Sequence, residues 1–372
     1  MEFAEPLPKT NAPTEGESGL VFCSTEEGVK EIFKERPAGR GLFVTDGSAL
    51  KAFRSCLPSR ALCLVLDSDG CLPLFRTSDD LSYVVAAGKK STLVSARFFA
   101  EIRKIPCTVF PVSMAFDGAY ERFGNVRFSG GEERVPLKEA KVCCDGEIVC
   151  DSAGQAYMRL LLSRLALIEA KAMRLFGADH GREEAEERAY SALLTLRAET
   201  LDIRSIALKN AAIRQCERDG MNGGEGAVLV ETIGREGEEQ AFFLLSALYA
   251  AFFERGKARL NVPDYAARAR YANVSYAAQK VPTVAEFALR AARLERMRSD
   301  LYRELNAFLG GTIHYRNNFF SLAGRRVSEE RNLSALRMLP ELTVGLSSLI
   351  RDFGLMEWRE DGIRKDILKK SV

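Results

Sequence analysis

Residues 82–126 constrain the fold of this 372-residue chain more than any other stretch. An apolar run at 83–87 meets Gly88 and a short polar turn, an amphipathic segment follows, and a second apolar run at 105–110 ends in Pro111. This order predicts a strand, a turn, a helix and a parallel strand. In such a unit the turn presents backbone N–H groups and the positive end of the helix, which favour a phosphate group. A nucleotide-binding site is therefore the first hypothesis.

Apolar strands alternate with helices through the first 110 residues, which is typical of a doubly wound, Rossmann-like α/β sheet with parallel strands. After Gly124 the pattern changes to shorter strands, with a hairpin turning at 129–131 and a returning core strand at 140–144. Before the central unit we expect strands at 20–23, 41–45 and 61–66, and helices at 25–34 and 48–56.

The second half of the chain predicts a different architecture, because the strand pattern largely stops beyond Ser152. Apolar spacing and richness in Ala, Leu, Arg and Glu predict helices instead. The glycine cluster at 220–226 is interpreted as a loop, since no strand precedes it and its spacing matches no phosphate-binding pattern. We therefore expect a flexible tail at 1–19, a nucleotide-binding α/β domain at 20–151 and an all-α domain at 152–372. Its expected helices are 153–176, 182–218, 238–255, 263–278 and 284–308.

Charge and composition narrow the choice of partner and compartment. Lys and Arg number 53 against 51 Asp and Glu, so the net charge of +2 favours neither a nucleic acid nor a membrane surface as partner. The residues at 1–19 carry acids, three prolines and no apolar core of a signal peptide, so we expect a cytoplasmic protein. Several of the nine cysteines lie inside apolar runs, where a thiol is usually a small buried hydrophobe, and these are Cys63, Cys107, Cys143 and Cys144.

Two sets of polar residues are candidates for a ligand site in the α/β half. Lys89 and Lys90 follow Gly88, where they are either phosphate ligands at a helix N-terminus or solvated residues of a turn. Asp46 follows the strand predicted at 41–45. It either faces the same cleft, since ligands collect at the carboxyl ends of parallel strands, or caps the next helix.

A family resemblance is carried by two segments of the chain and one residue between them. The chain has the sequence AGKKSTLV at 87–94, places Arg97 in the helix that follows, and continues with IPCTVFPVSMAFDG at 105–118. This resembles the iron-containing alcohol dehydrogenase superfamily, and within it the glycerol-1-phosphate dehydrogenases, glycerol dehydrogenases and dehydroquinate synthases. That superfamily has a turn of the type GGGxxxD, a basic residue in the helix and a following motif that ends in Asp-Gly.

The resemblance implies a dehydroquinate synthase-like fold and oxidation or reduction of a small polyol or polyol phosphate. The cofactor would be NAD or NADP, and members of the family commonly associate, which implies a homo-oligomer. Asp117 matches the position at which family members contact substrate, so it is the catalytic candidate. The candidate cofactor-binding residues are Asp46, Gly88, Lys89, Lys90, Ser91 and Ser113.

The metal site of the family has no clear counterpart in this sequence. Family members hold a divalent metal with one Asp and two His, but Gln155 stands where the Asp is expected, and the region at 240–279 contains no histidine. The two histidines of the chain are His180 and His314. We therefore expect no metal. The alternative function is that of an inactive or re-purposed family member, which binds a nucleotide or phosphate ligand without metal-dependent hydride transfer.

Overall fold

The structure is a computed structural model of the chain, and its side chains carry the contacts given below. It describes residues 19–35, 39–57, 61–66, 70–128, 130–177, 181–194, 196, 202–234, 237–255, 284–311, 329–343 and 345–352. The predicted tail at 1–19 lies outside these residues except for Gly19, and the predicted helix at 263–278 lies wholly outside them.

The chain packs into two compact units. The first comprises residues 1–157, 191–195 and 201–219, and the second comprises residues 158–190, 196–200 and 220–372. The boundary predicted between 151 and 152 lies in a run of short helical turns, α5 (Gly146–Val149) and η2 (Cys150–Ser152), which leads into α6 (Ala153–Phe176). One helix of the second half of the chain, α8 (Ile203–Arg218), belongs to the first unit.

The first unit is built on a six-stranded sheet in which every pair of neighbouring strands is parallel. The strand order is β1-β8-β5-β4-β2-β3. The central strand β4 has all but one of its residues buried, as expected for a strand covered on both faces. The strands are β1 (Leu20–Phe22), β2 (Arg40–Thr45), β3 (Leu62–Val65), β4 (Leu81–Gly88), β5 (Cys107–Pro111) and β8 (Ala140–Cys144).

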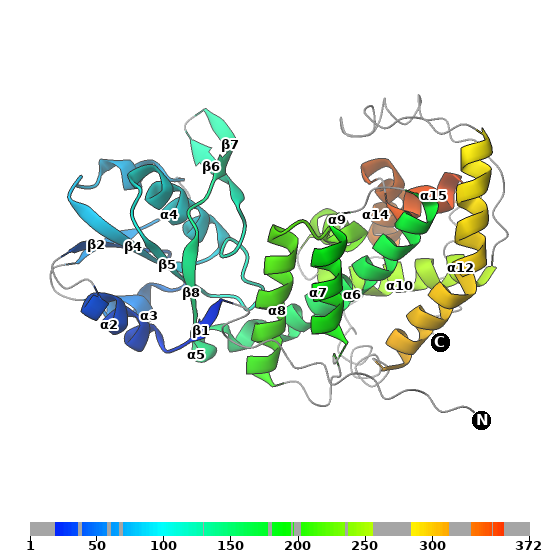
Figure 1. Ribbon diagram of the computed structural model, residues 1–372. Coiled ribbons are helices and arrows are strands. Elements are labelled where there is room, and N and C mark those ends of the chain that lie inside the picture. Colours follow the sequence, from blue (N-terminus) through cyan, green and yellow to red (C-terminus); the bar gives the residue numbers. More distant parts are fainter. Residues whose placement is uncertain are drawn as a thin grey trace. The chain divides into compact units, whose positions relative to one another are not determined.

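Helices cover both faces of this sheet. The helices α2 (Thr25–Glu35) and α3 (Leu50–Arg54) lie on one face, and α4 (Lys90–Arg103) lies on the other (Figure 1). Alternate residues of β4, Tyr83 and Val85 among them, pack in the cluster that contains residues of α2 and α3. The predicted doubly wound sheet of parallel strands is confirmed.

A separate hairpin follows the sheet's fifth strand. It consists of β6 (Phe123–Phe128) and β7 (Gly131–Pro136), which pair antiparallel as predicted. A short helical turn, η1 (Leu72–Arg76), packs near α4 on the hairpin side, where Phe75 contacts Phe98 and Phe98 contacts Phe128. The hairpin therefore extends the apolar packing of α4.

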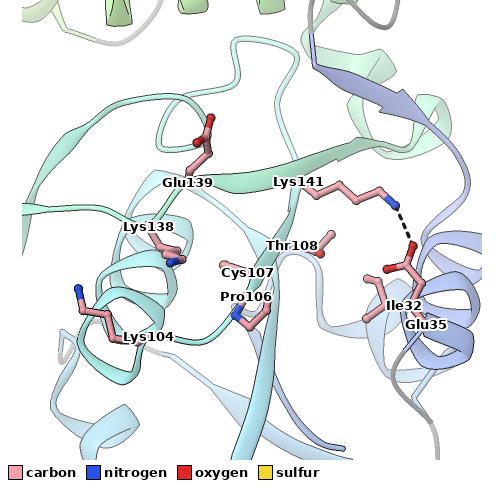
Figure 2. Close-up of a pocket in the computed structure, with 9 residues that line it drawn as sticks. All are labelled: Ile32, Glu35, Lys104, Pro106, Cys107, Thr108, Lys138, Glu139 and Lys141. Atoms are coloured by element: carbon pink, nitrogen blue, oxygen red, sulfur yellow. Dashed lines mark ion pairs between the residues drawn. The ribbon is translucent and has the colours of Figure 1, made fainter.

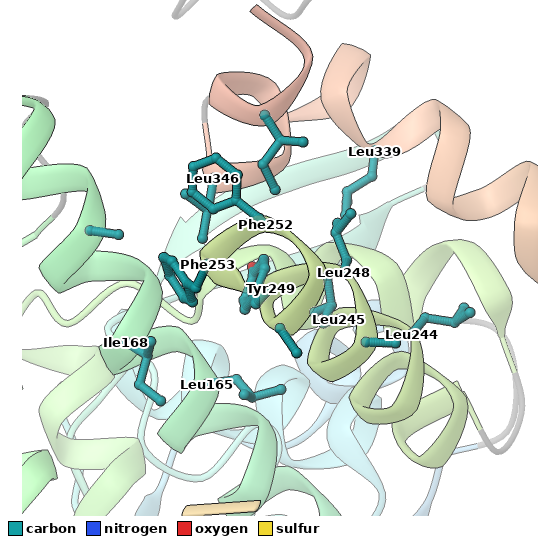
Figure 3. Packing of buried hydrophobic residues seen from close by; sticks show 14 of the residues in the cluster. Leu165, Ile168, Leu244, Leu245, Leu248, Tyr249, Phe252, Phe253, Leu339 and Leu346 are labelled. Carbon is teal, nitrogen blue, oxygen red and sulfur yellow. The ribbon is translucent and has the colours of Figure 1, made fainter. Parts of the chain in front are cut away.

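The described part of the second unit is helical, as predicted. Its core brings together apolar side chains of α6, α9, α10, α12, α14 and α15, with Leu165 and Ile168 of α6 facing Leu245 and Phe253 of α10 (Figure 3). No helix among the described residues is long and apolar enough to cross a membrane. Besides α6, the helices are α7 (Glu183–Leu193), α9 (Gly224–Ile233), α10 (Gly237–Arg255), α12 (Val284–Gly311), α14 (Glu329–Leu342) and α15 (Leu346–Asp352).

Two helical expectations need correction. The segment at 182–218 is two helices, α7 and α8, and the second begins where the carboxylate of Asp202 accepts a hydrogen bond from the N–H of Ser205 at 2.6 Å. The glycine cluster at 220–226 is a loop only at its start, because α9 begins at Gly224. A Cβ at Gly224 would lie 2.7 Å from the Cβ of Ala166, so glycine allows α9 to approach α6 closely.

Candidate functional site

The sheet has a topological switch point between β2 and β4. These strands are neighbours, but the chain passes from β2 to β3 on one side and from β4 to β5 on the other. Thr45 at the end of β2 pairs with Ala87 near the end of β4, so the two strands end at the same level. In open α/β sheets ligands bind outside the carboxyl ends of such strands. Here Asp46 follows β2, and Lys89 follows β4.

The carboxylate of Asp46 bridges the two turns at this point. Its Oδ1 accepts hydrogen bonds from the N–H groups of Ser48 at 2.9 Å and Ala49 at 3.3 Å, which holds the turn that leads into α3. Its Oδ2 accepts from the N–H of Lys89 at 2.6 Å and from the Thr92 hydroxyl at 3.0 Å, at the N-terminus of α4. Asp46 therefore holds the turn before α3 with one oxygen and contacts the N-terminus of α4 with the other, and its role toward a ligand stays a prediction.

This arrangement keeps the Asp46 carboxylate charged although the side chain is largely buried. Burial alone would raise its pKa, but hydrogen bonds from Ser48, Lys89 and Thr92 outweigh that effect and lower the pKa below its usual value. The negative charge also faces the positive end of the α4 dipole. An internal anion thus lies at the helix N-terminus where a phosphate was predicted.

Gly88 makes this close approach possible. Its φ is +155°, and a Cβ added there would overlap Oδ2 of Asp46 and lie 2.9 Å from its Cγ. Gly88 therefore allows the Asp46 carboxylate to approach the backbone at the end of β4.

Lys89, Lys90 and Ser91 are exposed at the first turn of α4. Within the described part of the chain, no hydrogen bond is made to the N–H groups of Lys90 and Ser91. Two backbone donors and two ammonium groups are thus available to an anionic ligand, while the Lys89 N–H is held by Asp46. The first turn of α4 therefore offers exposed donors, while the carboxylate oxygens of Asp46 already accept hydrogen bonds from the protein itself.

The catalytic candidate Asp117 lies in a tight loop that follows β5. Phe116 immediately before it has a positive φ of 55°, which is strained for a non-glycine residue. Arg214 of α8 donates to Asp117 Oδ1 at 2.6 Å and to the Ala115 carbonyl at 2.9 Å. Asp117 is therefore held in an ion pair, with its orientation set by α8. Ser113 lies in the same loop and holds its turn, because its Oγ accepts from the Ala115 N–H at 3.3 Å.

Arg97 anchors the other side of this loop. It is 2% exposed, and its three nitrogens donate to the carbonyls of Lys138, Gly118 and Glu121 at 2.8, 2.7 and 2.7 Å. Burial lowers the pKa of Arg97. The basic residue in the middle of α4 therefore binds backbone carbonyls of the protein itself.

The described residues contain no group of three His, Cys, Asp or Glu side chains that could hold a metal ion. His180 and His314 lie outside them, as does most of the region at 240–279. Gln155 is exposed in the first turn of α6. The described residues therefore do not fit a divalent metal of the kind that the sequence resemblance implies.

A cavity of about 320 Å³ lies at the opposite edge of the sheet, beside the amino ends of β5 and β8 (Figure 2). Its lining includes Cys107, Thr108 and three lysines. Lys141 reaches Glu35 at 3.8 Å, and Lys104 ion-pairs with Glu101. Two of the three lysines are thus paired with carboxylates, and the cavity is remote from Asp46 along the strands.

Sequence reasoning missed three partners at these sites. Thr92 stands in the first turn of α4, where its spacing from Gly88 offered a local indication. Arg214 lies 97 residues from Asp117, and Lys138 lies 41 residues from Arg97. No local pattern connects residues so far apart in the chain.

The fold is a doubly wound α/β unit followed by a helical second unit, and comparison with solved structures finds the following similar proteins. The chain is similar to an iron-containing alcohol dehydrogenase from Corynebacterium glutamicum, with 12% identity, a TM-score of 0.48, and 95% of this chain and 94% of that chain covered. It is similar to a maleylacetate reductase from a Rhizobium species, with 17% identity, a TM-score of 0.48, and 94% and 97% covered. It is also similar to a probable glycerol dehydrogenase from Sinorhizobium meliloti, with 13% identity, a TM-score of 0.45, and 76% and 97% covered.

No protein-family profile and no curated protein sequence matches the chain.

Proposed function

We propose that the first unit binds NAD or NADP at the carboxyl ends of β2 and β4, and that the protein is an oxidoreductase acting on a small alcohol, polyol or polyol phosphate. The observation that carries this proposal is the meeting of Asp46, Gly88 and Lys89 at the switch point of the parallel sheet. A bound nicotinamide cofactor would supply the hydride acceptor or donor.

The residues divide into three roles in this proposal. The N–H groups of Lys90 and Ser91, with the ammonium groups of Lys89 and Lys90, bind a phosphate of the cofactor. Asp46 accepts a hydrogen bond from a ribose hydroxyl, and Ser113 keeps the loop after β5 in place. Asp117 binds the substrate, and Arg214 is its positioning residue.

A second candidate function is binding of a nucleotide or phosphate ligand without hydride transfer. It is favoured by a specific observation, because the Asp46 carboxylate already accepts the Lys89 N–H and the Thr92 hydroxyl that a phosphate oxygen would otherwise engage. An anion bound there must avoid Asp46 or displace it. The substitution Asp46→Ala should therefore weaken the binding of a ribose hydroxyl and strengthen the binding of a phosphate group.

The test is a thermal-shift titration of the full chain with NAD, NADP, ADP and glycerol phosphates, with and without Zn²⁺. Ligand at 100 times its Kd should stabilise the protein by about 2.7 kcal/mol. The shift should be lost in Lys89→Ala/Lys90→Ala and kept in the control Lys34→Ala, which alters an exposed lysine of α2. A melting temperature that responds to no dinucleotide would overturn the proposal.

Asp46→Ala and a turnover assay then separate the two candidates. If Asp46 contacts the ribose, the variant should weaken NAD binding, whereas it should strengthen inorganic phosphate binding if the α4 N-terminus is the phosphate site. NAD(P)-linked oxidation of glycerol-1-phosphate or glycerol would support the dehydrogenase. Dinucleotide binding without turnover of any small alcohol would support the second candidate.

The compartment and assembly are part of the same proposal. All nine cysteines are free thiols in the structure, which suits a reducing compartment such as the cytoplasm. A homo-oligomer is proposed from the resemblance, and light scattering of the purified chain measures it directly.

A further inference from the structure

Two buried carboxylates of the helical unit meet at one hydroxyl group. Glu169 of α6 and Glu225 of α9 are each 1% exposed. The Tyr249 hydroxyl of α10 lies 3.0 Å from Glu169 Oε2 and 2.9 Å from Glu225 Oε2. Figure 3 shows Tyr249 among apolar neighbours on α10, including Leu245, Leu248 and Phe252. The three oxygen atoms therefore share a site that water does not reach.

Counting hydrogens shows what this contact requires. Both oxygen–oxygen distances are those of hydrogen bonds, and each bond needs a proton between its two atoms. Tyr249 supplies one proton, and an ionised carboxylate supplies none. The second proton must therefore come from a carboxyl group. The N–H of Glu225 donates to Glu169 Oε2 at 2.9 Å, so Glu169 Oε2 acts as an acceptor toward both partners.

The other contacts of Glu225 suit a neutral carboxyl group with its proton on Oε2. Its Oε1 accepts from the Thr343 hydroxyl at 2.7 Å and from the Ser347 N–H at 3.1 Å, and also from the Ser347 hydroxyl. Oε2 also lies 3.0 Å from the Ser347 N–H. A carbonyl-like Oε1 can accept these bonds while Oε2 donates to Tyr249.

Among the described residues, no cation of the packed helices forms an ion pair with Glu225. The described part of the chain shows no ion pair with Glu225, and α9 itself has no basic residue. The cations of α6 ion-pair with other carboxylates, with Arg159 bound to Glu238, Arg164 and Lys171 to Glu304, and Arg174 to Glu186. Among the described residues, the side chains that bond to the Glu225 carboxyl group are Tyr249 of α10 and the neutral hydroxyls of Thr343 and Ser347.

We propose that Glu169 and Glu225 hold one proton between them through Tyr249, and that this proton ties α6, α9 and α10 together. When the proton is lost, two carboxylates face each other in an apolar core and the packing of the three helices loosens. The helical unit is thus a proton-sensitive element that weakens as the pH rises. Burial raises the pKa of Glu225 to about 7, with a further contribution from the charge of Glu169, so the change falls near neutral pH.

The experiment compares amide hydrogen exchange of the full chain between about pH 5 and pH 9, as protection factors for α6, α9 and α10. Because opening releases this proton only while the folded protein still holds it, protection should fall by about tenfold per pH unit between the unfolded pKa of a glutamate and the raised folded pKa of Glu225, and should level off above the folded value. In Glu225→Gln the carboxamide N–H₂ donates to Tyr249 as the protonated acid does, so this dependence should vanish. The matched control Glu231→Gln alters an exposed residue of α9 and should retain it.

A second measurement does not depend on the folding of a variant. The infrared spectrum of the wild-type chain should contain the carbonyl stretching band of a protonated carboxyl group at neutral pH, and this band should disappear as the pH rises. Protection that does not change with pH in the wild type, an unchanged pH dependence in Glu225→Gln, or the absence of that band would each overturn the proposal.

Discussion

The carboxylate of Asp46 accepts a hydrogen bond from the backbone N–H of Lys89 at 2.6 Å, across 43 residues of chain. This bond joins the end of β2 to the N-terminus of α4 and gives the helix a capping anion from another strand. The same carboxylate holds the turn before α3 through Ser48. One side chain thus organises the carboxyl edge of the sheet, where the proposed ligand binds.

Gly88→Ala should destabilise the first unit. The new Cβ would overlap Oδ2 of Asp46 and would sit on a backbone with a φ of +155°. Strain and the lost capping bonds together should cost about 2 to 3 kcal/mol, measured by urea unfolding of the full chain. The control is Gly47→Ala, whose Cβ would meet nothing within 4 Å and should change stability by less than about 0.5 kcal/mol. Equal losses in the two variants would contradict the role of Gly88.

Asp46→Asn should change how stability depends on pH in acid. Because hydrogen bonds lower the pKa of Asp46 in the folded state, its contribution is fully present above the unfolded pKa near 4 and is lost as the pH falls through the lower folded value. The asparagine caps without titrating, so part of the acid destabilisation should disappear while stability at neutral pH falls by about 1 kcal/mol. Unfolding curves between about pH 2 and pH 7 measure this. The same substitution at exposed Asp151 should leave the wild-type dependence in place.

The strands of the first unit were predictable because each is a short apolar run that ends in a turn residue. The strand predicted at 140–144 is β8, and the run at 83–87 is the middle of β4. The burial of Cys63 was predicted wrongly. It lies exposed on β3, which is an edge strand with only β2 beside it, so alternate residues face outward. Sheet position is set by long-range pairing, which an apolar run does not encode.

The candidate site was predictable only in its local part. The order of strand, Gly88 turn and helix indicated the edge at which Asp46 and Lys89 meet, because parallel strands end together. The contacts of Asp117 and Arg97 involve partners far away in the chain, so no local spacing of residues in the sequence could indicate them. The sequence also did not indicate that α9 begins within a glycine cluster. Glycine has a low helix propensity, but Gly224 lets α9 pack closely against another helix.

Arg97→Met should destabilise the loop that carries Asp117. The substitution keeps an apolar stem in α4 but leaves the buried carbonyls of Gly118, Glu121 and Lys138 without their donor. We expect a loss of about 3 kcal/mol in urea unfolding. Arg103→Met, in the last turn of the same helix, removes an ion pair to exposed Asp79 and should cost at most about 1 kcal/mol. A loss for Arg97→Met no larger than that of the control would refute the anchoring role.

Asp117 and Arg214 should prove energetically coupled. Their ion pair at 2.6 Å is partly buried, and Arg214 also holds the Ala115 carbonyl, so its loss affects both the charge and the loop. A double-mutant cycle with Asp117→Asn and Arg214→Leu should give a coupling free energy of about 1 to 2 kcal/mol.

The matched control cycle uses Arg218→Leu and Glu139→Gln. Arg218 lies one turn after Arg214 on α8, and its ion pair with Glu139 is more exposed, so a coupling free energy of about 0.5 kcal/mol or less is expected. If the proposed oxidoreductase activity is measured, Arg214→Leu should lower kcat more than Arg218→Leu, because only Arg214 orients the carboxylate proposed to contact substrate. Coupling that is the same in both cycles would mean that Arg214 holds α8 to the sheet without positioning Asp117.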